Sequence, residues 1–354
     1  MLVLFLWLAA EWAALSSGSS ASLRGVSGVS GRVAWASGAK GTVLRTVDGG
    51  ATWKALSVPG GEALDFRDVE AFDANRAILM SAGPGAASRI YATDDGGDQW
   101  KLLFENPDTK GFFDSIAFWD RRRGLIAGDA VDGRMTLLRT EDGGASWRKA
   151  DTVPVANEGE GAFAASGTVV TVRPGGLAWL ATGGKGGGRV YRSTDWGRTW
   201  HAVQTPLRHD SDSSGIFSIA FRDDHHGVVV GGDYAKPDED RENIAYTEDG
   251  GGTWTAGRAR PRGFRSAVVF IDGALLVTGT SGSDISRDGG RTWTPSGDRG
   301  YNALSVAEGA VWAAGAGGRI GRYSEHAVCS SLPFCSAFVR LTDSDSNSRS
   351  HHSV

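Results

Sequence analysis

The chain has 354 residues, 52 of them glycine, and a formal net charge of −4 at pH 7. This weak negative charge gives no reason to expect nucleic acid or an anionic membrane as a partner. Glycine is about twice as common as its usual share of roughly 7%, and helical apolar periodicity is nearly absent. The composition therefore predicts a β-rich protein with many turns.

The first ten residues, MLVLFLWLAA, are apolar but too short for the ~20 residues that span a bilayer. They have the length of a signal-peptide core and are followed by small residues, although no Lys or Arg precedes them. We expect residues 1–10 to belong to a signal peptide, which either begins here or is truncated with its start codon upstream, and the protein to be exported without a stable membrane span. The alternative is a buried apolar first strand.

One motif, Ser/Thr-x-Asp-x-Gly-x-x-Trp, occurs six times. Successive copies are 47, 47, 53, 54 and 39 residues apart. Periods of this length are typical of propellers and solenoids. The Asp and Trp of the six copies are Asp48 and Trp53, Asp95 and Trp100, Asp142 and Trp147, Asp195 and Trp200, Asp249 and Trp254, and Asp288 and Trp293.

Each repeat contains four short apolar runs separated by glycines, which is the pattern of a propeller blade. In the fourth repeat we place the first run at 161–167. Residues 301–323 supply three further runs without the motif, and the sequence WAAL from Trp12 aligns with WKAL from Trp53. The sequence therefore predicts an all-β, seven-bladed propeller of four-stranded blades over residues 11–323, closed by an N-terminal strand at about 12–16.

The motif falls between the third and fourth strands of each blade and so must form a turn. Aspartate accepts hydrogen bonds from backbone N–H groups of its own loop, glycine supplies a positive φ, and tryptophan packs on the turn. This predicts a structural role for all six aspartates and tryptophans. No catalytic residue is assigned to the motifs.

These motifs resemble the BNR or Asp-box repeat of sialidases, sortilin-type ectodomains and the photosystem II stability and assembly factor family, over about residues 12–323. The undecorated ring with an N-terminal signal peptide looks most like the assembly-factor-like group. That resemblance implies a non-catalytic binding or assembly protein without cofactor or metal. The alternative is a glycan-acting hydrolase of the sialidase type, but no Arg-Ile-Pro stretch occurs and no tyrosine matches a nucleophile.

Ligands of propellers commonly bind at the channel mouth, where the innermost strands converge. Alignment of the first strands predicts a ring of equivalent positions, with either Glu160 or Gly161 in the fourth repeat. Its arginines would suit a carboxylate, a phosphate or an acidic segment of a protein partner. We expect the ring itself to be a monomer. Alternatively, the arginines pair with Asp68 and Asp114 and only solvate the channel. The ring consists of Arg24, Arg67, Asp114, Phe217, Arg265 and Asn302.

Two inter-blade segments, 208–215 and 232–243, are weaker candidates. The second contains Asp233, Tyr234, Lys236, Asp238 and Glu239. His209, Asp210 and Asp212 lie close together and could hold a metal ion, but acidic residues beside serine more often form a solvated turn. The tail from 324 to 354 is polar and of low complexity, which predicts disorder. Its cysteines, Cys329 and Cys335, either close a small loop or are incidental.

Overall fold

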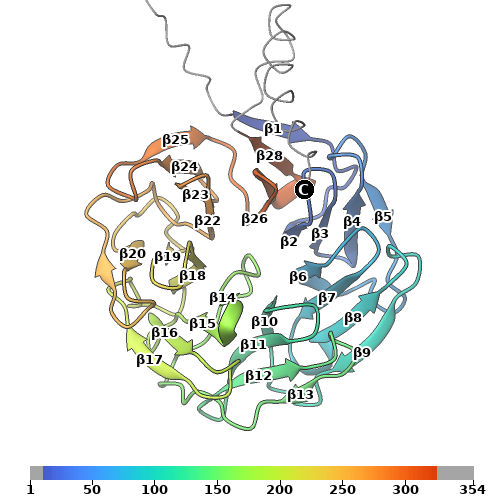
Figure 1. Cartoon of the computed structure of the whole chain (residues 1–354), viewed down its shortest axis with the longest axis horizontal. Coiled ribbons are helices and arrows are strands. Elements are labelled where there is room, and N and C mark those ends of the chain that lie inside the picture. Colours follow the sequence, from blue (N-terminus) through green and yellow to red (C-terminus); the bar gives the residue numbers. More distant parts are fainter. Residues whose placement is uncertain (1–10, 325–354) are drawn as a thin grey trace, which may run out of the picture.

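The computed structural model describes residues 11–324, which form a ring of seven four-stranded antiparallel sheets (Figure 1). This confirms the predicted seven-bladed propeller. Residues 1–10 and 325–354, including both cysteines, lie outside the described part of the chain. No helix among residues 11–324 is long and apolar enough to cross a membrane.

Each blade runs outwards from an innermost strand to a rim strand. The first three blades contain β2 (Leu23–Gly28), β3 (Ala34–Gly38), β4 (Thr42–Thr46) and β5 (Lys54–Leu56); β6 (Asp65–Ala71), β7 (Ala77–Ala82), β8 (Arg89–Thr93) and β9 (Lys101–Glu105); and β10 (Phe113–Phe118), β11 (Gly124–Val131), β12 (Arg134–Thr140) and β13 (Arg148–Lys149).

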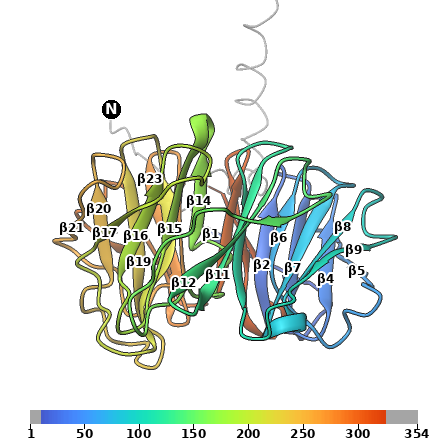
Figure 2. The ribbon, with the colours of Figure 1, turned by 90° about the horizontal axis from the view of Figure 1, so that it is seen from below.

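The next three contain β14 (Val170–Arg173), β15 (Leu177–Ala181), β16 (Arg189–Ser193) and β17 (His201–Gln204); β18 (Ser214–Phe221), β19 (Gly227–Asp233), β20 (Ile244–Thr247) and β21 (Thr255–Ala256); and β22 (Ala267–Ile271), β23 (Ala274–Gly279), β24 (Gly282–Ser286) and β25 (Thr294–Gly297). Three short 3-10 turns are η1 (Gly85–Ala87), η2 (Pro174–Gly176) and η3 (Ala316–Gly318). Figure 2 shows the blades from the side, with the strands running between the two faces of the ring.

The seventh blade closes the ring. It contains β26 (Ala303–Ala307), β27 (Ala310–Ala314), β28 (Ile320–Ser324) and, as its rim strand, β1 (Glu11–Leu15). Strand β1 pairs antiparallel with β28, so that Trp12 lies opposite Tyr323. The predicted closure by an N-terminal strand is therefore confirmed, and it leaves no blade with an unpaired third strand.

Large apolar side chains on the second strands fill the spaces between blades. Trp35, Trp179 and Trp312 are fully buried. Each donates an Nε1 hydrogen bond to a backbone carbonyl oxygen of a neighbouring blade, that of Asp73, Gly250 or Ser30. Buried indole groups of this kind contribute both apolar area and a satisfied polar contact, which holds adjacent blades in register.

All six motif turns share one hydrogen-bonding pattern. An Oδ atom of the aspartate accepts from the backbone N–H four residues later; for Asp48 the donor is Thr52, at 2.9 Å. The hydroxyl of the Ser or Thr two residues before the aspartate donates to the same carboxylate and accepts from the N–H of the glycine two residues after it. In the first motif that glycine is Gly50, whose φ of 88° disfavours a side chain. Each aspartate is thus occupied within its own turn.

The fourth blade differs from the sequence expectation. Its innermost strand is β14, where Val170 pairs with Leu180, and the predicted strand at 161–167 is wrong. Residues 161–167 form a loop outside the regular strands, with an isolated bridge between Gly161 and Gly183. The physical reason is that Phe163 in this loop stacks on Phe217 of the next blade, which draws the segment over the channel.

Candidate functional site

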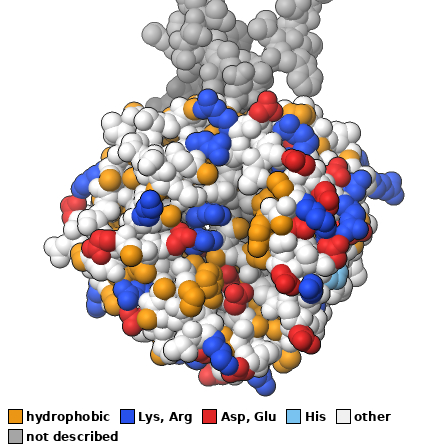
Figure 3. Space-filling model, turned by 180° about the vertical axis from the view of Figure 1, so that it is seen from behind, with side chains coloured by type: hydrophobic (Ala, Val, Ile, Leu, Met, Phe, Trp, Pro, Cys, Tyr) orange, Lys and Arg blue, Asp and Glu red, His pale blue; other side chains and the backbone are white. Residues whose placement is uncertain are grey.

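A cavity of about 1040 Å³ opens where the innermost strands begin. We call this end of the channel the bulge mouth, because four of the residues that line it are the extra residues of β-bulges. It opens on the face shown in Figure 3, where cationic side chains lie on one side of the centre and hydrophobic side chains on the other. The residues that line the bulge mouth include Arg24, Arg67, Phe112, Asp114, Asp129, Glu160, Phe163, Asp212, Phe217, Tyr234, Phe264 and Asn302.

Four of the predicted ring residues are the extra residues of β-bulges. The register shifts between residues 23 and 25 in β2, 66 and 68 in β6, 113 and 115 in β10, and 216 and 218 in β18. The residues left without a partner are Arg24, Arg67, Asp114 and Phe217. Because a bulge bends its strand and re-aims a side chain, the repeated bulge explains why these side chains meet in one cavity.

The two arginines of the mouth differ in how they are held. Arg67 Nε donates to Asp65 Oδ2 at 2.6 Å, and Nη1 donates to the carbonyl oxygen of Ala164 at 2.8 Å. Arg24 is half-buried, and its guanidinium makes no hydrogen bond or ion pair with another residue of 11–324. Burial and the neighbouring Arg67 lower the pKa of Arg24, while Asp65 raises it. Arg24 is therefore a desolvated cation without a bound counter-charge among the described residues.

Two of the acidic residues that line the cavity, Asp114 and Asp129, influence each other. Asp114 is 1% exposed, and its Oδ2 has no hydrogen-bond partner. Burial and the neighbouring Asp129 raise the pKa of Asp114 well above its usual range, against the opposing effects of Arg67 and the Ala164 N–H. Burial also raises the pKa of Asp129, whose Oδ1 accepts from the Ala162 N–H at 2.9 Å.

Glu160, by contrast, is fully engaged. It pairs with Arg189 and accepts hydrogen bonds from Thr182 Oγ1 at 2.7 Å and Tyr191 Oη at 3.0 Å. Its backbone lines the mouth, but its carboxylate is neutralised within the fourth blade. The sequence alignment, which assigned this slot to Glu160 or Gly161, therefore placed two loop residues where the other blades have a strand.

An aromatic wall forms the other side of the mouth. Phe163 stacks on Phe217 with ring centroids 4.0 Å apart, and Phe264 meets Phe217 edge to face at 4.7 Å. Tyr234 packs edge-on against Phe163 and Phe217 and is 55% exposed. Phe112 is half-buried in the same cavity. The wall offers an apolar surface suited to an aliphatic or aromatic side chain.

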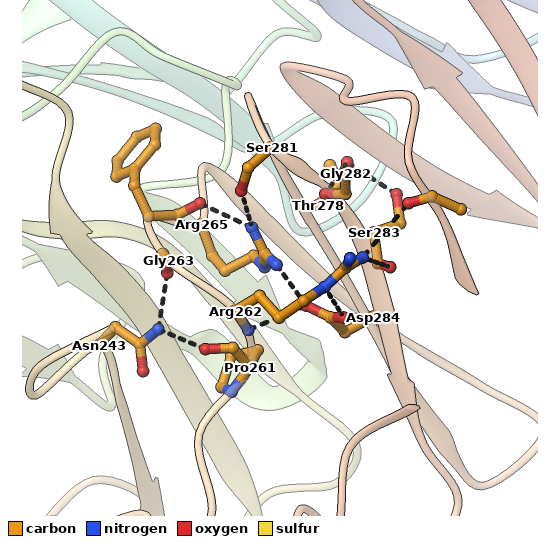
Figure 4. A network of polar contacts seen from close by, with 12 residues as sticks. Asn243, Pro261, Arg262, Gly263, Arg265, Thr278, Ser281, Gly282, Ser283 and Asp284 are labelled. Atoms are coloured by element: carbon orange, nitrogen blue, oxygen red, sulfur yellow. Dashed lines mark hydrogen bonds and ion pairs between the residues drawn. The ribbon is translucent and has the colours of Figure 1, made fainter. Parts of the chain in front are cut away.

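Of the two remaining predicted residues, Asn302 lines the mouth and Arg265 does not. Asn302 Nδ2 donates to the carbonyl oxygen of Leu23 at 2.8 Å and so links the last blade to the first. Arg265 is completely buried, pairs with Asp284 and donates to Ser281 Oγ at 3.1 Å (Figure 4). No bulge is present in β22 to turn Arg265 towards the channel. The expected three-arginine ring is thus a two-arginine site.

Sequence alignment did not single out Asp129, Phe163 or Phe264 as residues of the mouth. Asp129 follows directly on the apolar run of a second strand, at the point where the chain reaches this face. That position is the feature of the sequence from which its place in the mouth could have been predicted. Phe163 and Phe264 lie in loops outside regular strands, so strand alignment has no means of placing them. Tyr234, in the segment after β19, lines the mouth as well.

The acidic loop at 208–215 is held by ion pairs with arginines. Asp210 pairs with Arg208 at 2.6 Å and with Arg241, and His209 Nδ1 contacts the carbonyl oxygen of Leu207 at 2.7 Å. Asp212 lies 3.8 Å from Lys185 Nζ. Within residues 11–324 no group of three His, Cys, Asp or Glu side chains is arranged to hold a metal ion.

The opposite mouth of the channel has a different chemistry. Serine, threonine and acidic side chains line a cavity of about 320 Å³ there, among them Ser27, Asp68, Glu70 and Ser305. Ser305 Oγ accepts from the Gly28 N–H at 2.9 Å, Ser27 Oγ from the Ala71 N–H at 3.0 Å, and Asp68 Oδ2 from the Ile116 N–H at 2.8 Å. These contacts join successive innermost strands, so the polar side chains at this end hold neighbouring blades together.

No protein-family model and no curated protein matches the sequence. Solved structures match it over most of its length. YCF48 bound to a D1 peptide is 18% identical with a TM-score of 0.61, covering 88% of this chain and 96% of that one. YCF48 from Cyanidioschyzon merolae has the same identity and TM-score, covering 89% of this chain and 99% of that one.

An inactive virginiamycin B lyase from Staphylococcus aureus, solved with quinupristin, is 13% identical with a TM-score of 0.65, covering 89% of this chain and 99% of that one. Identities this low show the fold alone. The chain therefore shares the seven-bladed propeller fold with both binding proteins and an enzyme.

Proposed function

We propose that this protein is a non-catalytic binding or assembly platform that holds an extended segment of a partner protein in the bulge mouth. An acidic group of the segment would meet Arg24 and Arg67, and an apolar side chain would lie on the aromatic wall. The observation that carries this proposal is the half-buried side chain of Arg24, whose guanidinium makes no hydrogen bond or ion pair with another residue of 11–324. A desolvated cation without a partner is costly unless an anion binds it.

The aromatic wall supports a peptide rather than a bare anion as ligand. Binding sites concentrate their affinity in buried aromatic anchors, and a partly exposed tyrosine beside stacked phenylalanines offers such an anchor to a partner side chain. The similarity to YCF48, which has been solved with a D1 peptide, adds that a propeller of this shape accommodates a peptide. We also interpret the six motifs as Asp-box repeats and residues 1–10 as supporting export; fractionation of cells tests the latter.

A library of capped decapeptides tests the binding proposal. Each peptide carries one Glu and one Phe at every relative spacing in a Gly/Ser background, and a matched set has Gln in place of Glu. We expect the protein to retain some Glu/Phe peptides, and the Arg24→Gln variant to bind them at least tenfold more weakly. Arg258→Gln is the matched control, because Arg258 is exposed and does not line the mouth. Unchanged retention by Arg24→Gln would overturn the proposal.

A glycan-acting hydrolase is the second candidate, because two carboxyl side chains, those of Asp114 and Asp129, share the cavity. Glycosidases act through two such groups on either side of the scissile bond. The burial of Asp114, which is 1% exposed, argues against its reaching a glycosidic oxygen. Cleavage of any member of a glycoside panel, lost in Asp114→Asn, would replace the binding proposal with this one.

A further inference from the structure

The bulge mouth contains a pair of carboxyl groups, those of Asp114 and Asp129, that make no ion pair with a cation among residues 11–324. Asp114 makes no ion pair within residues 11–324, and its Oδ2 is buried without a hydrogen-bond partner. Asp129, half-buried beside it, uses Oδ1 to accept from the Ala162 N–H. A buried acceptor left open in this way costs free energy that a bound donor would recover.

Arg67 makes its ion pair with Asp65 and not with either carboxyl group of this pair. Its Nε donates to Asp65 and its Nη1 donates to the Ala164 carbonyl oxygen, so two of its three guanidinium nitrogens are already engaged. Arg24 on β2 makes no ion pair with the two carboxyl groups either, and Lys110, which also lines the mouth, bonds Asp132 at 2.8 Å. The mouth therefore has an anion-accepting side at Arg24 and, separately, an uncompensated acidic side.

From this arrangement we propose that Asp129, with Asp114 behind it, forms a cation subsite that takes the ammonium or guanidinium group of a basic side chain. The partner segment would then carry a basic group in addition to its acidic and apolar groups. This last step depends on the proposed function, since it assigns both charges to one segment. The subsite itself depends only on the two carboxyl groups.

The protonation of the pair is consistent with this role. Burial raises the pKa of both carboxyls, and the like charge of Asp129 raises that of Asp114 further, so the empty pair holds a proton more tightly than an exposed carboxylate would. An arriving cation favours the ionised form and displaces that proton. A neutral ligand of the same shape gains nothing from the exchange.

Small amines test the subsite without requiring any peptide to bind. We would titrate the full chain with n-butylammonium and, as the neutral counterpart, n-butanol. The reporters are the backbone amide NMR signals of Ala162 and Ala164, whose N–H groups bond Asp129 and Asp114. We expect saturable shifts with butylammonium only, and a Kd at least tenfold higher in Asp129→Asn.

Glu248→Gln is the matched control, because Glu248 is an exposed carboxylate that does not line the mouth. It should leave the Kd for butylammonium unchanged. Equal shifts with n-butanol, or an unchanged Kd in a folded Asp114→Asn/Asp129→Asn double variant, would overturn the subsite. If butylammonium binds as expected but no Glu/Phe peptide does, the proposed function fails while the subsite stands.

Discussion

Trp12 in β1 lies directly opposite Tyr323 in β28, with ring centroids 5.4 Å apart. The same indole lies 4.8 Å from the ring of Tyr301, on the segment that leads into β26. One side chain from the N-terminal strand thus contacts two aromatic residues near the other end of the ring. Closure of the propeller depends on aromatic packing as well as on the backbone ladder between β1 and β28.

We therefore expect Trp12→Ala to lower the free energy of unfolding by about 2 to 4 kcal/mol, because it leaves a cavity between these rings. Trp12→Phe, which keeps an aromatic ring, should cost less. Urea unfolding measures both, with Leu102→Ala as the control, since Leu102 is 46% exposed on a rim strand. A wild-type unfolding midpoint for Trp12→Ala would show that β1 does not hold the ring closed.

Asp195 tests whether a motif aspartate acts only within its turn. It accepts from the Thr199 N–H at 2.8 Å, Thr199 Oγ1 at 2.6 Å and Ser193 Oγ at 2.9 Å. Burial raises its pKa, but these hydrogen bonds prevail and hold it at about 2. Its stabilisation is therefore present above the unfolded pKa of 3.8 and is lost as pH falls towards 2.

Asp195→Ala should lower the free energy of unfolding at pH 7 by about 1 to 2 kcal/mol, a modest value because the carboxylate is partly solvated. The difference from wild type should shrink as the pH is lowered. Binding of Glu/Phe peptides should not change, since Asp195 does not line the mouth. Loss of peptide binding in a folded variant would mean that the motif has a functional role.

The seven-bladed ring could be predicted from the sequence because each repeat marks its own turns and strands by local residue patterns. The spacing of the six motifs located the turns, and the likeness of WAAL to WKAL identified the closing strand. The site was predicted less completely because alignment fixes strand positions but not side-chain directions. Arg24 and Arg67 face the mouth because a bulge turns them there, whereas Arg265, at the aligned position, lacks a bulge and is buried against Asp284.

Glu70 at the opposite mouth should make stability depend on pH. Burial raises its pKa from 4.5 to about 7. Between these values the unfolded chain loses the proton first, so the folded state becomes relatively less stable as pH rises and the penalty is complete above about pH 7. Because the side chain is half-buried, we expect Glu70→Gln to stabilise the protein by about 1 to 2 kcal/mol at pH 8 and not at pH 4.

Urea unfolding at both pH values checks this expectation. The control is Glu248→Gln, which removes a carboxylate from an exposed position in a motif turn. That variant should follow the wild-type pH dependence. If Glu70→Gln gives the same change in stability at pH 4 and pH 8, the carboxyl group is not desolvated in the channel.

Asp284 should be essential for stability because of the cations that it neutralises. It pairs with Arg262 at 2.7 Å and with Arg265, which is completely buried. Asp284→Ala would leave Arg265 as a buried charge without a counter-ion, at a cost of about 3 to 5 kcal/mol. Adding Arg265→Met removes the stranded charge and should recover much of that loss, because the flexible methionine side chain can pack where the aliphatic stem of Arg265 lies. Chemical unfolding of the single and double variants measures the recovery.

Arg265→Met alone should bind Glu/Phe peptides like the wild type, whereas Arg24→Gln should not. Equal losses of binding in these two variants would place Arg265 in the site after all, despite its burial against Asp284.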